Sequence, residues 1–64
     1  MTLAKNLKRL RTATKQSQLT VAKRVRVTQS LIAQLETGAV LNPKIVTLRR
    51  LAKALNTSVA ALLD

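Results

Sequence analysis

Apolar residues recur at helical spacing along most of the chain, and short polar segments separate the apolar runs. In the first run, Leu3, Leu7 and Leu10 fall on one side of a helix, while lysines and arginines occupy the rest of the turn. The later runs repeat this amphipathic pattern. It predicts five short helices and no strand, over 2–13, 18–25, 29–36 and 44–55, with a last helix that contains Val59, Leu62 and Leu63.

The residues between the runs are suited to begin and end helices. A hydroxyl side chain just before a helix can accept a hydrogen bond from a free N–H group of the first turn, and proline fits the first helical position. Gly38 and Asn56 follow two of the runs, where a residue in the left-handed conformation would end a helix. The predicted helix starts lie at Ser17, Thr28, Ser58 and Pro43.

The 64 residues are enough for one small domain, which we expect to span residues 1–64. The chain contains no cysteine and no histidine, so neither a disulfide nor a thiolate metal site can stabilise it. Its only acids are Glu36 and Asp64, too few to hold a metal ion, and we expect no cofactor. Because aromatic residues are also missing, the core has to be built from Leu, Val, Ile and Ala.

The chain carries twelve Lys and Arg residues against two acids, a formal charge of +10. A charge of this size indicates an anionic partner, and nucleic acid, an anionic membrane surface or an acidic protein would each fit. No apolar stretch approaches the length of a membrane span. We expect neither an enzyme nor a small-molecule substrate, because no residues form a recognisable nucleophile with its general base.

The segment from Gln18 to Leu35 is the most informative part of the sequence. Only three residues, 26–28, join two predicted helices, and so short a connection holds the helices at a large angle. Ala22 is small enough to let the second helix approach the first closely. Apolar residues of both helices, Ile32 among them, would then close a common core.

This segment resembles a known DNA-binding motif. The run QLTVAKRVRVTQSLIAQLETG resembles the helix-turn-helix of the Cro and repressor family, as in phages lambda and 434. The later run NPKIVTLRRLAKALNTSVAALL resembles the final two helices of that family, so the likeness covers nearly the whole chain. It implies an all-α, compact five-helix, lambda-repressor-like domain that binds a double-stranded DNA operator as a phage-type transcriptional regulator.

The resemblance also implies which residues contact the bases. In that family the N-terminal part of the second motif helix enters the major groove, and its side chains meet base edges. A glutamine amide can donate and accept at the same time, as the edge of adenine requires, and serine or threonine suits several bases. The recognition helix is expected over 29–36, with base contacts from Thr28, Gln29, Ser30 and Gln34.

Positive charge flanks the expected recognition helix and is missing from it, since no Lys or Arg lies between Val27 and Pro43. The division agrees with DNA recognition, in which phosphate contacts position a protein and base contacts specify sequence. By the resemblance, Gln18, Thr37 and Lys44 contact phosphates. Most other cations are expected to form a solvated face with long-range attraction only; these are Lys5, Lys8, Lys15, Lys23, Arg24, Arg49, Arg50 and Lys53.

Two further positions take their meaning from the resemblance. Glu36 matches a family position that pairs with an arginine on the first helix, here Arg11, so a structural ion pair is expected. Arg26 stands where the family usually has glycine in the motif turn. If Arg26 has a positive φ, it costs about 1 kcal/mol relative to glycine.

Other functions fit part of the pattern. A domain of the same fold could act as an antitoxin-like protein-interaction module, and the basic amphipathic first helix is also typical of a cationic membrane-surface peptide. We expect DNA and not a membrane, because the inner helices carry caps and apolar stripes that face one another. Family members act as dimers on DNA, and Val59 and Leu62 are candidates for a weak self-contact or for core packing. The resemblance implies a cytoplasmic location in a bacterial or phage-infected cell.

Overall fold

The computed structural model describes residues 2–64, and within this range it contains helices and no strand. The predicted all-α, five-helix fold is confirmed, with the first four helices beginning and ending within one residue of the predicted positions. No helix in the described part of the chain is long and apolar enough to cross a membrane. The helices are α1 (Leu3–Ala13), α2 (Gln18–Val25), α3 (Gln29–Thr37), α4 (Ile45–Ala54) and α5 (Val59–Leu63).

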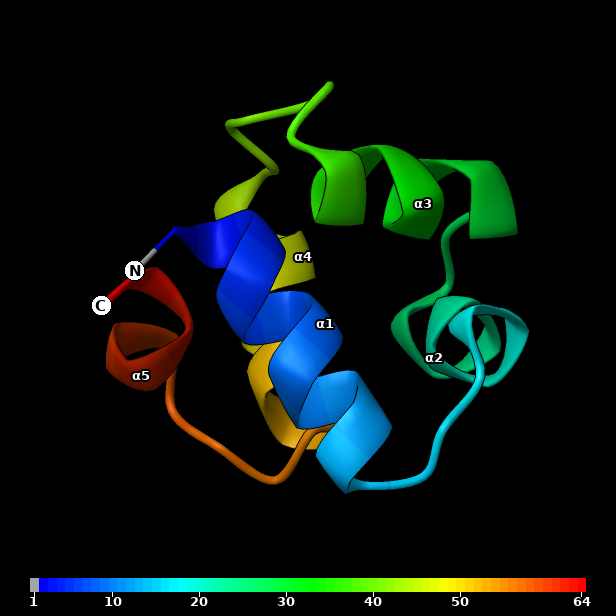
Figure 1. Ribbon diagram of the computed structural model, residues 1–64, viewed down its shortest axis with the longest axis horizontal. Helices are drawn as coiled ribbons and strands as arrows, with labels where there is room; N and C mark the ends of the chain where they lie inside the picture. Colours follow the sequence, from blue (N-terminus) through cyan, green and yellow to red (C-terminus); the bar gives the residue numbers. More distant parts are fainter. Residues whose placement is uncertain (1) are drawn as a thin grey trace.

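The helices surround one core, which every helix helps to build. Figure 1 shows α1 in front of α4, with α2 and α3 on one side of this pair and α5 on the other. Helix α1 packs against α3 and α5, while α4 packs against α2 and α5. The central side chains are aliphatic and almost fully buried; they include Leu7, Val21, Ile32, Leu51 and Leu62.

The apolar side of α1 packs into this core. Leu7 is fully buried, and Leu3 and Leu10 pack against the buried cluster. The apolar side of α5 also packs into the core. Leu62 has no exposed surface, and Val59 is partly buried against the core. Leu62 was a candidate for self-contact or core packing, and the structure assigns it to the core.

Three of the four predicted helix starts are confirmed. The hydroxyls of Ser17, Thr28 and Ser58 accept hydrogen bonds from the backbone N–H three residues later, at 3.0, 3.1 and 3.0 Å. Pro43 precedes α4 and does not occupy its first position, because α4 begins at Ile45, one residue after the predicted start, and its N-cap is Lys44. Lys44 has an extended ψ of 153°, so the helix cannot start before it, and the fixed φ of proline suits an extended segment as well as a helix.

Four helix ends are closed by a residue with positive φ. Gly38 and Asn56 take this conformation as predicted, and Lys15 and Arg26 take it as well. At Arg26 the φ is 65° and the ψ is 44°. There the N–H of Arg26 donates to the carbonyl of Lys23 at 3.3 Å and the N–H of Val27 to that of Ala22 at 3.0 Å. This pair of bonds is the Schellman arrangement, which satisfies carbonyls at the helix end.

Candidate nucleic-acid interface

Helices α2 and α3 form a tight corner that fixes which side of α3 faces outward. Residues 26–28 connect them, as predicted, and the left-handed residue Arg26 reverses the chain before Thr28 caps α3. Ala22 is 1% exposed and Ile32 is fully buried in the common core. Burial of one side of α3 leaves its opposite side on the surface.

The four residues expected to meet DNA bases are all exposed on this outer side. The side chains of Gln29, Ser30 and Gln34 form no hydrogen bond with any residue in the range 2–64, so their donors and acceptors are available to a ligand. The hydroxyl of Thr28 accepts the capping bond from the N–H of Leu31 at 3.1 Å, and its own hydrogen is left to donate. Two free amides and a hydroxyl on one helix are the groups that read base edges in a major groove.

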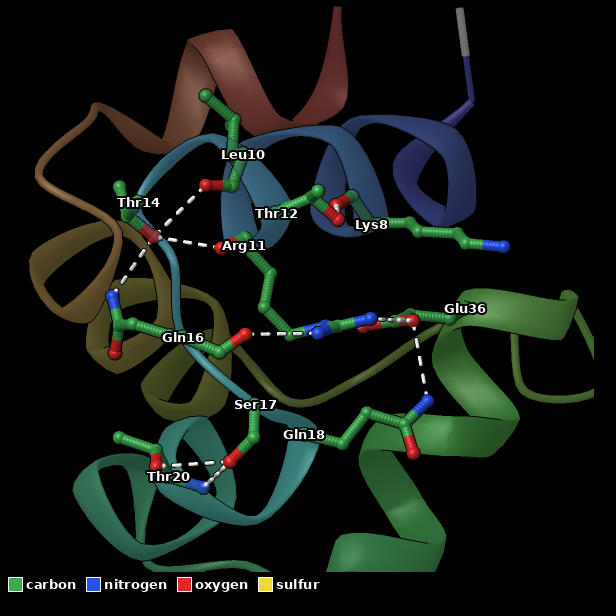
Figure 2. Close-up of polar contacts among 10 residues, drawn as sticks. All are labelled: Lys8, Leu10, Arg11, Thr12, Thr14, Gln16, Ser17, Gln18, Thr20 and Glu36. Carbon is green, nitrogen blue, oxygen red and sulfur yellow. Dashed lines mark hydrogen bonds and ion pairs between the residues drawn. The ribbon is translucent and has the colours of Figure 1, made fainter.

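Arg11 and Glu36 lie together and tie α1 to α3 (Figure 2). The Nε of Arg11 is 2.6 Å from Oε2 of Glu36, and Nη2 donates to Oε1 at 3.1 Å, so the pair is bidentate. The remaining Nη1 donates to the backbone oxygen of Gln16 at 2.9 Å. The side chain of Glu36 is only 4% exposed and that of Arg11 15%. The hydrogen bond to Glu36 raises the pKa of Arg11 further above its ordinary value.

Gln18, expected to contact a phosphate, is engaged inside the molecule as well. Its Nε2 donates to Oε1 of Glu36 at 3.2 Å, a contact between α2 and α3 that Figure 2 shows beside the ion pair. An amide nitrogen carries two hydrogens, so one remains for an outside acceptor. The sequence did not indicate this contact, because 18 residues separate the partners and neither lies on an apolar stripe.

The other two expected phosphate contacts lie at the two ends of the α3–α4 connection. Thr37 is exposed at the end of α3, and its hydroxyl donates to the backbone oxygen of Gln34 at 3.2 Å. Lys44 is exposed just before α4, where its side chain forms no capping bond. Within residues 2–64 no group of three or more potential metal ligands lies together.

The chain matches the family model of the helix-turn-helix domain over residues 2–64. Among solved structures, hydroxypropylphosphonic acid epoxidase from S. wedmorenis is 29% identical and has a TM-score of 0.88; the match covers 97% of this chain and 32% of that chain. A structure of apo-HppE has the same identity, a TM-score of 0.87 and coverage of 97% and 34%. The chain spans about a third of the length of these structures. No curated protein matches it.

Proposed function

We propose that this chain, which belongs to the helix-turn-helix domain family, binds double-stranded DNA with α3 in the major groove. The observation that carries the proposal is the free polar side of α3. Gln29, Ser30 and Gln34 have no partner among residues 2–64, while the other side of α3 is held in the core. A side chain that is both exposed and unbonded can exchange its water contacts for base contacts without breaking any bond of the fold.

Phosphate contacts would set the position of α3 in the groove. Gln18 at the start of α2, together with Thr37 and Lys44 at the ends of the α3–α4 connection, would bind the strands beside the reading side chains. The absence of Lys and Arg from 28–42 fits this division, because phosphate contacts position a protein on DNA and contacts to base edges specify the sequence. The net charge of +10 would speed the encounter with DNA.

Within this function, the sequence resemblance to Cro and the repressors of phages lambda and 434 supports a regulator that occupies an operator. Such a protein blocks or recruits transcription by its position on DNA, and members of that family bind as dimers to half-sites about one helical turn apart. A weak dimer that forms on DNA fits this model. Two copies of a chain with this charge repel each other in solution, and DNA phosphates would offset that repulsion.

The test is a selection of preferred duplexes from a pool of random sequences, at a stated salt concentration. We expect one enriched motif, built of half-sites if the protein dimerises on DNA. The enriched duplex should bind at least about a thousandfold more tightly than random duplex, the lower end of specific protein–DNA recognition. Equal affinity for all duplexes would reject a sequence-reading role for α3.

A second function is favoured by the structural likeness to part of an epoxidase chain. The matched epoxidase structures are about three times as long as this chain, so a domain of this shape can occur as one part of a larger protein. The net charge of +10 would then suit an acidic protein surface against the free side of α3, as in an antitoxin-like interaction module. Failure to enrich any duplex, combined with binding to an acidic protein partner, would favour this function.

A further inference from the structure

Four cationic side chains surround one hollow on the face formed by α2 and α4. The hollow has a volume of about 430 Å³ and is lined by Arg24, Arg26, Arg50, Lys53 and Ala54. No residue of α3 belongs to it, so it is separate from the surface proposed to read DNA bases. For three of these cations the sequence predicted only a solvated face. Whether they lie close together depends on how α2 packs against α4, which the sequence pattern does not show.

No carboxylate of the protein lines this hollow. The chain has two acids, and Glu36 is held by Arg11 at the contact between α1 and α3, while Asp64 lies beyond the end of α5. Four like charges around one hollow repel one another, and only solvent and counter-ions offset this repulsion in the free protein. An anion bound among them would remove it.

Two features hold the cations in place before any ligand arrives. Nη1 of Arg50 donates to the backbone oxygen of Val25 at 3.5 Å, which directs the guanidinium toward the end of α2. Arg26 keeps a left-handed conformation in which a residue with a side chain is less stable than glycine. This conformation ends α2, and it places the guanidinium of Arg26 at the rim of the hollow.

We infer that this hollow is a binding site for adjacent phosphate groups of the pyrophosphate type. The planar guanidinium groups bind phosphate oxygens in pairs, and the volume and four positive charges suit two phosphates better than one. Two sources could supply a pair of phosphate groups: a free small molecule that carries a diphosphate, or the backbone of a nucleic acid, in which a sugar separates neighbouring phosphates. The site does not depend on the proposed reading of bases by α3.

The test is a titration of the ¹⁵N-labelled chain with sodium pyrophosphate at constant ionic strength, followed by amide chemical shifts. We expect saturable shifts centred on 24–27 and 50–54, and a weaker response to sulfate. Arg26→Gly should weaken pyrophosphate binding about tenfold, the loss of one charge-assisted hydrogen bond. This variant also relieves the left-handed backbone, so weaker binding cannot be attributed to unfolding.

Lys8→Ala is the matched control, because it removes one positive charge from the exposed face of α1 and leaves the hollow intact. We expect it to change pyrophosphate affinity by less than about twofold, since distant charges are screened at moderate salt. Shifts spread over all basic faces without saturation, or equal losses in Lys8→Ala and Arg26→Gly, would overturn the inference.

A second arm of the experiment distinguishes the two sources. The protein is first saturated with a short DNA duplex and then titrated with pyrophosphate. Unchanged pyrophosphate affinity would assign the site to a free phosphorylated molecule. Competition between the duplex and pyrophosphate, with weaker duplex binding by Arg26→Gly, would assign it to backbone phosphates. The Gln29→Ala variant should bind pyrophosphate normally in both arms, so failure of base reading and failure of this site give different results.

Discussion

The side-chain amide of Asn6 donates to the backbone oxygen of Leu62 at 2.8 Å, so the first helix holds the end of the last. The same nitrogen donates to the oxygen of Asp64 at 3.0 Å. Asn6 is 1% exposed. The carbonyl of Leu62 lies in the last turn of α5, where carbonyls have no partner within the helix, and Asp64 is the C-cap residue. One buried amide therefore satisfies the end of a five-residue helix that could not persist alone.

We expect Asn6→Ala to lower the free energy of unfolding by about 1–3 kcal/mol, because it leaves buried carbonyl groups without a donor. Thermal denaturation followed by circular dichroism would measure the loss, and amide hydrogen exchange would locate it in α5. Asn42→Ala is the control, since Asn42 is exposed in the α3–α4 connection, and it should change stability by less than about 0.5 kcal/mol. Equal effects of the two variants would contradict this role of Asn6.

Removal of Arg11 should be more damaging than removal of any other cation. Arg11→Ala leaves the nearly buried carboxylate of Glu36 without its bidentate partner, and we expect a loss of about 3 kcal/mol in the free energy of unfolding. A domain of this size has about 3–5 kcal/mol in total, so the variant should keep at most about 2 kcal/mol and be only marginally folded near room temperature. Urea denaturation with and without the substitution provides the measurement.

The double variant Arg11→Met, Glu36→Leu tests the cause of that loss. An apolar pair of similar volume removes the unpaired charge, so most of the stability should return.

The pH dependence of stability is a further check on the ion pair. The pKa of Arg11 is raised in the folded state, so its contribution is complete below the pKa of the unfolded chain and is lost only as the pH rises through the folded value. The difference between the wild-type protein and Arg11→Ala should therefore stay constant from about pH 6 to 9.

Arg26→Gly should stabilise the protein. Glycine reaches the left-handed conformation of the turn without a steric penalty, and we expect a gain of about 0.5–1 kcal/mol after its greater freedom in the unfolded chain is included. Arg26→Ala is the control, because it removes the same charge and keeps the side-chain carbon that causes the strain. If both variants gained equal stability, charge repulsion and not backbone conformation would be the cause.

Gln29→Ala should weaken binding to the selected duplex by about 1–3 kcal/mol and leave binding to random duplex nearly unchanged. Titration of both duplexes at one salt concentration gives the two dissociation constants. Thr12→Ala, on the exposed side of α1, should change neither constant. An equal loss on both duplexes would show that Gln29 does not read bases.

Lys44→Ala should act differently from Gln29→Ala. A phosphate contact carries no sequence information, so both duplexes should lose affinity to about the same extent. The slope of log affinity against log salt should become shallower by about 1. Lys5→Ala, which removes a charge from α1, should leave the slope unchanged. A steeper loss on the selected duplex alone would place Lys44 at a base.

The helices were largely predictable because their signals are local. Ser17, Thr28 and Ser58 each cap within three residues, and Gly38 and Asn56 end helices through their own backbone preferences. The local sequence is therefore enough to predict where these helices begin and end. Pro43 misled because its fixed φ suits both a helix start and the extended segment that it occupies.

The contacts between helices were less predictable, because they depend on chain segments far apart. Asn6 meets Leu62 across 56 residues, and Gln18 meets Glu36 across 18. In the sequence, a polar residue that bonds to a distant part of the chain cannot be distinguished from a polar residue that faces solvent. The pair of Arg11 and Glu36 was indicated only by the resemblance to a family, and the hollow between α2 and α4 was not indicated at all.

The side chains that face outward from α3 contribute almost nothing to holding the molecule together, since three of the four expected to meet bases form no bond within residues 2–64. Substitutions at Gln29, Ser30 and Gln34 can therefore accumulate without selection against misfolding. If α3 reads bases as proposed, the domain could acquire a new target sequence in few steps, while Arg11, Glu36 and Asn6 preserve the scaffold that presents α3.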